Sequence, residues 1–256
     1  MWKRLLLILA LTGAIAPAYA TDYTDLWWNP AQSGWGVNFT HSDNFIFATM
    51  FVYEVDGTPT WVVAELTRTP VGTYFGPVFA TTGPYFGATP YDRTLLTSPQ
   101  VGTATFRPAG PATGDFDYSV RNVFVSKIIQ RQTMVPAALE GVYFGGLGMT
   151  LTGCDDPERN RINYTYASFF VDRYSANEIQ IDVGSDSGWN CAFRGTLVQE
   201  GMVNQVPEAT YTCNDGLRVI GTVSELRRTS LGIEGRWSAP VSEGCRQDVS
   251  FSGVRR

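Results

Sequence analysis

Short segments of apolar residues recur along the chain, and turn residues separate each one from the next. In the segment 35–40 apolar and polar residues alternate, which predicts a strand with one buried face. The segment 45–55 is apolar at nearly every position, which predicts a strand buried on both faces. Asp56-Gly57 is a turn signal, so the segment 60–67 is expected to return as the hairpin partner.

The rest of the chain repeats this strand pattern and offers no helix beyond one short turn at 90–95. In the first half, Pro84, Pro90 and Pro99 predict a loop over 85–99, because proline breaks a strand ladder. Further strands are predicted at 73–81, 101–107, 116–120, 123–131, 141–152, 162–173, 178–183, 190–199, 209–213, 218–228, 232–238 and 248–254. Abundant Thr, Val, Tyr, Phe and Gly favour the same all-β class.

The segment 134–139 divides the chain into two parts of ordinary domain size. We expect a first β domain over 21–133, a linker over 134–139 and a second β domain over 140–256. Both are expected to be small and antiparallel. The second half has eight predicted strands, which could close into an up-and-down barrel and so remove both sheet edges.

All four cysteines lie in the second half at long spacings, which favours two disulfides over a metal or redox motif. Cys191 and Cys213 are placed symmetrically about Met202, so a hairpin there sets them opposite each other. Cys154 follows the first strand of the predicted barrel and Cys245 precedes the last. In a closed meander these strands are neighbours, so the expected bonds are Cys154–Cys245 and Cys191–Cys213.

The first twenty residues have the pattern of a secretory signal peptide. Lys3 and Arg4 precede an apolar run, and Ala18-Tyr19-Ala20 predicts cleavage before Thr21. The run is too short for a membrane span, and no later stretch is long enough. We therefore expect a secreted or periplasmic protein without a transmembrane segment.

The charge balance bears on the class of partner. The formal net charge is −5, and loss of Lys3 and Arg4 takes it to about −7. A mildly acidic chain without a basic cluster is a poor candidate for binding nucleic acid or an anionic membrane. With one histidine and no metal or dinucleotide motif, we expect no metal and no cofactor.

The run of residues 26–36, Leu-Trp-Trp-Asn-Pro-Ala-Gln-Ser-Gly-Trp-Gly, resembles a module of uncharacterised exported bacterial proteins with the signature W-W-N-P-x-x-S-G-W-G. The pieces 47–49, 56–61 and 81–84 also look like that module, and the resemblance covers about residues 24 to 133. The second half looks like a cysteine-containing domain that can follow it. The resemblance implies export, a bacterial source and modularity, but no established activity.

The tryptophan-rich segment carries the main functional expectation. Aromatic faces stack on sugar rings, and amide or hydroxyl groups bind sugar hydroxyls. The candidate ligand-binding residues are Trp27, Trp28, Asn29, Gln32, Ser33 and Trp35. The alternative is that these tryptophans fill the core and Asn29 holds a turn. Adjacent tryptophans on a strand point to opposite faces, so at least one of Trp27 and Trp28 is expected to face outward.

The catalytic candidates are weaker. His41, Ser42 and Asp43 are consecutive, and neighbouring side chains do not converge into a triad, so a turn is the better interpretation. Glu54 and Glu65 lie on neighbouring predicted strands and could serve glycoside hydrolysis if they face each other.

Three hypotheses follow, and the sequence identifies no catalytic constellation. The leading one is a non-catalytic binding protein for a glycan or another envelope or extracellular ligand. The alternatives are a structural or protein-interaction protein, such as an inhibitor or assembly factor, and a hydrolase that uses Glu54 or Glu65.

Overall fold

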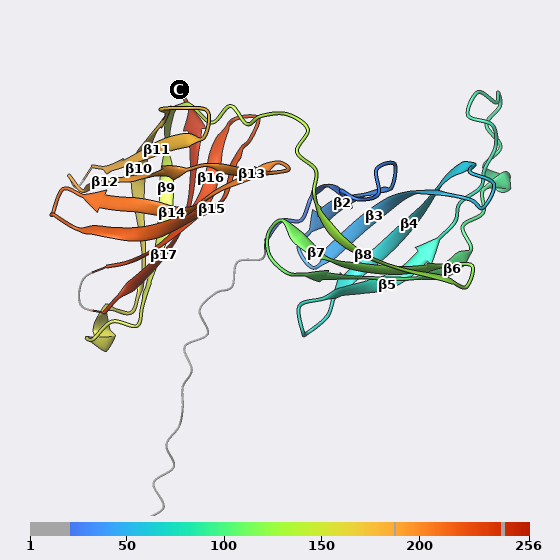
Figure 1. Cartoon of the computed structure of the whole chain (residues 1–256), viewed down its shortest axis with the longest axis horizontal. Helices are drawn as coiled ribbons and strands as arrows, with labels where there is room; N and C mark the ends of the chain where they lie inside the picture. Colours follow the sequence, from blue (N-terminus) through green and yellow to red (C-terminus); the bar gives the residue numbers. More distant parts are fainter. Residues whose placement is uncertain (1–20, 187, 242–243) are drawn as a thin grey trace, which may run out of the picture.

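The computed structural model describes residues 21–186, 188–241 and 244–256 of the chain. The predicted signal peptide at 1–20 lies outside them. These residues form two closed antiparallel sheets that lie side by side (Figure 1). No α-helix occurs in the described ranges, and the only helical turns there are 3-10 turns at Arg93–Leu95 and Pro157–Arg159. The all-β prediction is confirmed.

The first sheet is a closed eight-stranded barrel in sequential order. Its strands are β1 (Asp25–Trp28), β2 (Gly36–Ser42), β3 (Phe45–Tyr53), β4 (Pro59–Arg68), β5 (Tyr74–Phe79), β6 (Gln100–Pro108), β7 (Thr113–Val120) and β8 (Val123–Arg131). Closure comes from β1 pairing with β8 through Trp27↔Arg131 and Trp28↔Gln130. The sequence analysis did not predict β1 or the closure of this half.

Alternate residues of each strand point into this barrel and form an aromatic core. Trp27, Phe39 and Phe106 lie at its centre, with ring centroids 4.9–5.6 Å apart. Tyr74 and Phe116 pack around them and are also fully buried. The barrel interior is therefore filled by side chains.

Strand β3 corrects one prediction. Ile46, Ala48 and Met50 are buried inside the barrel, but Phe47 and Phe51 on the opposite face are exposed. The prediction of burial on both faces was wrong because β3 has the barrel interior on one side and no covering layer among the described residues on the other. Its outer face is nevertheless aromatic.

The second sheet contains β9 (Gly141–Thr152), β10 (Ile162–Arg173), β11 (Glu178–Ser185), β12 (Asn190–Thr196), β13 (Val198–Glu200), β14 (Val203–Cys213), β15 (Arg218–Arg228), β16 (Gly232–Pro240) and β17 (Arg246–Arg255). Strands β12 and β13 both pair with β14, so they act as one strand interrupted at Leu197. The first strand, β9, pairs with the last, β17, and the additional β12–β14 pairing completes the ring. The predicted eight-stranded meander barrel with two disulfides is confirmed.

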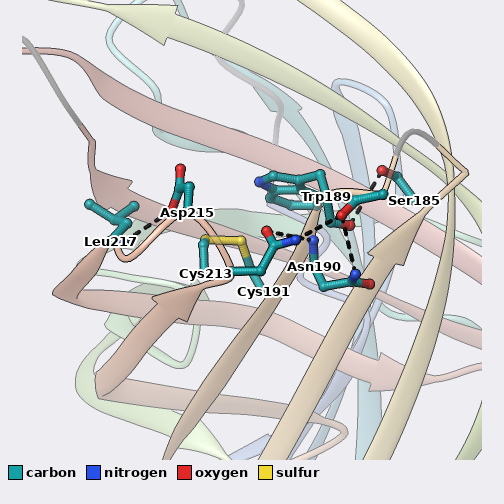
Figure 2. The surroundings of a disulfide bond; sticks show 9 residues. Ser185, Trp189, Asn190, Cys191, Cys213, Asp215 and Leu217 are labelled. Carbon is teal, nitrogen blue, oxygen red and sulfur yellow. Dashed lines mark hydrogen bonds between the residues drawn. A yellow bond between two sulfur atoms is a disulfide. The ribbon is translucent and has the colours of Figure 1, made fainter.

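Both predicted disulfides are present, Cys154–Cys245 and Cys191–Cys213. Cys191 and Cys213 are directly opposed on β12 and β14, and the hairpin turns at Gly201-Met202. Figure 2 shows this bond beside Trp189 and Asn190, where the backbone N–H of Ser185 donates to the carbonyl of Trp189 at 2.9 Å. Two disulfides are typical of proteins in an oxidising compartment.

Candidate functional site

Trp27 is part of the core and is not available to a ligand. Its indole is fully buried beside Phe39 and Phe106, and its N–H donates to the carbonyl of Tyr23 at 3.0 Å. Arg131 covers the ring from the barrel end, 5.0 Å from the centroid. For Trp27 the ligand-binding expectation is therefore corrected, because even-numbered β1 residues face outward and odd-numbered ones inward.

The turn between β1 and β2 is held together by its own side chains. The Asn29 carboxamide accepts from the backbone N–H of Ala31 at 2.9 Å and donates to the carbonyl of Ile128 at 3.1 Å. Trp35 is half-buried and stacks on Tyr118, whose hydroxyl accepts from the indole N–H at 3.0 Å. Asn29 and Trp35 thus have structural roles in this turn.

Gln32 and Ser33 are the exposed members of the predicted set. The ammonium of Lys127 hydrogen-bonds to the Gln32 carboxamide and lies 4.9 Å from the centre of the Trp35 ring. Burial lowers the pKa of Lys127. This arrangement fixes the turn against β8 and leaves the hydroxyl of Ser33 at the surface.

Trp28 faces outward, as expected for one of the adjacent tryptophans, and lies where the two barrels meet. It lines a cavity of about 330 Å³ together with Gln130 and Thr133 of the first half and Gln199 and Glu200 of the second. Its indole N–H is buried and has no hydrogen-bond partner among the described atoms. Trp28 therefore faces the junction of the barrels, whereas Gln32 and Ser33 lie exposed in the turn between β1 and β2.

A buried ion pair anchors this junction. The Asp25 carboxylate accepts from Arg131 at 3.1 Å and from the backbone N–H of Met202 at 2.8 Å. Both charged side chains are almost fully buried. Gly201 has φ of +64°, and a Cβ there would lie 2.3 Å from the Asp25 carboxylate, so only glycine allows the β13–β14 turn to dock so closely.

A second group of charges joins the barrels beside this pair. Asp22 contacts Arg227 of β15 at 2.6 Å and His41 of β2 at 3.7 Å. Burial would raise the pKa of Asp22, but hydrogen bonds with His41 and Arg227 outweigh it and hold the pKa well below its usual range. Arg227 also binds Glu234 of β16, so its guanidinium lies between carboxylates of the two barrels.

An exposed aromatic surface covers the outside of β3 and β4, and we call Phe51, Tyr53 and Trp61 the aromatic platform. Phe51 is directly opposite Trp61 across the two strands, and Tyr53 is two residues further along the same face. The three side chains are 49%, 58% and 56% exposed. Such large exposed rings in one group mark an interaction site more often than chance solvent exposure.

Polar and small residues border the aromatic platform. Gly36 is opposite Phe51 on β2, so no side chain screens that edge of the ring. Asn38 and Thr49 form the next pair along the same face. A Cβ at Gly34 would lie 3.4 Å from the Tyr53 hydroxyl, which places the turn containing Gln32 and Ser33 beside the platform.

The aromatic platform was not predicted from the sequence. The signal was present, because Phe51 and Tyr53 alternate with buried or half-buried residues and Trp61 follows the hairpin turn. It was interpreted as burial on both faces, since a one-dimensional pattern does not distinguish a covered outer face from an exposed one.

The two acids considered for hydrolysis do not face each other. Glu65 is opposite Phe47 on β3, whereas Glu54 follows the end of β3 and pairs with Arg121 at 2.9 Å. Seven residues of strand separate the two positions, about 23 Å at 3.3 Å per residue. Paired carboxylates in glycosidases lie about 5–10 Å apart, so the hydrolase interpretation is wrong for this pair.

Two searches of the described residues gave negative results. In the ranges that the structure describes, no group of three or more His, Cys, Asp or Glu side chains could hold a metal ion. None of the helical segments there is long and apolar enough to cross a bilayer.

Comparison with known proteins does not assign the chain to a family. No family model matches the chain. A stretch of 77 residues, 30% of the chain, is 32% identical to kin of IRRE-like protein 2 from Homo sapiens and covers 9% of that protein. The chain thus spans a small part of the relative that it matches, and this similarity does not establish a family.

Proposed function

We propose that the protein is an exported, non-catalytic binding protein whose aromatic platform holds an extended neutral polysaccharide of the envelope or extracellular space. The observation that carries this proposal is the exposed cross-strand pair Phe51–Trp61 with Tyr53 beside it. The disulfides, the predicted signal peptide and the resemblance to the W-W-N-P-x-x-S-G-W-G module support export and a bacterial source.

The chemistry of the surface favours a sugar polymer. The faces of aromatic rings pack against the C–H faces of pyranose rings, and neighbouring amide and hydroxyl groups satisfy the sugar hydroxyls. Asn38, Thr49, Gln32 and Ser33 supply such groups at the border of the platform. Because the platform is a sheet face rather than an enclosed cavity, it suits a chain that lies across it.

The test is retention of the exported protein on insoluble polysaccharides, including peptidoglycan, cellulose and chitin. Trp61→Ala should lower the affinity about tenfold or more, since it removes a stacking ring. Phe124→Ala is the matched control, because Phe124 is an exposed aromatic of β8 outside the platform, and it should bind like the wild type.

Two results would count against the proposal. Retention on none of the polymers would reject the ligand class and favour a protein partner for the platform. Equal loss of retention in Trp61→Ala and Phe124→Ala would show that binding does not depend on the platform.

A further inference from the structure

The second barrel has a groove of about 640 Å³ on its outer surface, formed by β10, β9 and β17. Two tyrosines form one side, Tyr164 and Tyr166, and they are 76% and 80% exposed. Ser250 and Ser252 form the other side. A volume of this size is within the range of small-molecule binding sites.

The strand register defines the geometry of the groove. Tyr166, Gly146 and Ser252 lie in one row across the three strands, and Tyr164, Gly148 and Ser250 lie in the next. Two strand spacings separate the tyrosine side from the serine side, about 9–10 Å. Tyrosine rings therefore face serine hydroxyls across a strand that has glycine in both rows.

The floor of the groove is open above Gly146. A Cβ at this position would meet only the backbone carbonyl of Thr165, at 3.3 Å. The Tyr164 ring leans over Gly148 instead, 3.1 Å from the position of its missing Cβ. The free space thus lies between Tyr166 and Ser252, where a flat ligand can contact the aromatic ring and the hydroxyl together.

The charges around the groove favour a neutral ligand. Among the described residues that line it there is no Asp, Glu, Lys, Arg or His. Beyond the serines, β16 presents Glu234 and Arg236, which are opposite in sign and paired with Arg227 and Glu225. An anionic or cationic ligand would find no unpaired countercharge in this lining.

We propose that this groove is a second saccharide-binding site, which holds a neutral sugar unit between Tyr166 and Ser252. The ring of Tyr166 stacks on the sugar, and the hydroxyls of Ser250 and Ser252 bind its hydroxyl groups. The ligand class rests on the proposed function, but the site is separate from the aromatic platform. Two sites on one chain would strengthen retention on a polymer through effective concentration.

The experiment is titration of the exported protein with three soluble probes, cellohexaose, xylohexaose and chitohexaose, followed by calorimetry and chemical-shift mapping. The expected result is two sites for one of these probes. Tyr166→Ala and Ser252→Phe should each abolish one site, the first by removing the stacking ring and the second by filling the groove. Trp61→Ala should abolish the other.

Phe170→Ala is the matched control, because Phe170 is exposed on the same face of β10 but outside the groove. Circular dichroism and thermal midpoints establish that each variant is folded. Two sites that survive in both folded groove variants would overturn this assignment and leave the platform proposal intact. Polymer retention without any chemical-shift change at the groove of the wild type would do the same. If instead the groove site is present but Trp61→Ala removes no site, only the proposed function is overturned.

Discussion

Asp25 connects the buried ion pair of the first barrel to the β13–β14 turn of the second. Its carboxylate accepts from the N–H groups of Leu26 and Met202 and from the guanidinium of Arg131. Arg131 in turn donates to the carbonyls of Pro111 and Thr24. Because each group has several partners, the desolvation of both charges is compensated.

Removing one member of this pair should destabilise the fold strongly. Asp25→Ala leaves Arg131 charged, buried and without its carboxylate partner, so we expect a loss of about 3–5 kcal/mol in the free energy of unfolding. Urea denaturation measures this loss. Asp117→Ala, which breaks the partly exposed Arg107–Asp117 pair, is the control and should cost about 1 kcal/mol or less. A similar cost for both variants would contradict the role of burial.

The tryptophan pair shows the limit of prediction at single residues. Opposite orientations of Trp27 and Trp28 follow from the two-residue period of a strand. Which one enters the barrel depends on the pairing of β1 with β2 and with β8, and β8 is about a hundred positions away in sequence. The predicted ligand-binding role of Gln32 and Ser33 stays a prediction.

At the scale of elements, hairpin geometry was predictable wherever a turn residue and paired side chains defined the register. Cys191 and Cys213 are opposed as the symmetry about Met202 requires. The register then shifts by one residue between β12 and β13, at Leu197, which no residue pattern marks in advance. β1 was missed because four residues are too short for a reliable alternation.

The disulfides should contribute unequally to the second barrel. They close loops with sequence separations of 91 and 22 residues. On the chain-entropy account they stabilise by about 4.6 and about 3.4 kcal/mol. We expect the double variant C154A/C245A to lose more stability in guanidinium denaturation than C191A/C213A, with each double variant serving as the reference for the other. The reverse order would show that restriction of the unfolded chain is not the main effect.

At the scale of the molecule, the barrels are joined by charge as well as by the chain. The last strand of the first barrel ends at Arg131 and the first strand of the second begins at Gly141, on either side of the predicted linker. The sequence indicated two β domains. It did not predict their docking, because the contacts of Asp22 and Asp25 with β15 and the β13–β14 turn join residues about 200 positions apart.

The Asp22 contacts predict a specific response to acid. The pKa of Asp22 is lowered in the folded protein, so its stabilisation is present above about pH 4, the ordinary pKa of aspartate, and is lost as the pH falls below it. The difference in free energy of unfolding between wild type and Asp22→Asn should therefore be largest at pH 5–7 and shrink towards pH 2, as measured by urea denaturation.

Asp248→Asn is the control for this series, because Asp248 forms an exposed pair with Arg246 away from the junction and such pairs contribute little. A wild-type advantage over Asp22→Asn that stays constant from pH 7 to pH 2 would argue against the lowered pKa.

The seam that closes each barrel also determines how the chain responds to tension. In both barrels the first strand pairs with the last in antiparallel orientation. A force applied at the two ends of a barrel therefore separates these two strands one residue pair at a time. The first barrel has two residue pairs in this seam and the second has ten. If the protein is held between two anchored ligands, opening the first barrel therefore takes less work than opening the second, and we expect the first barrel to open first.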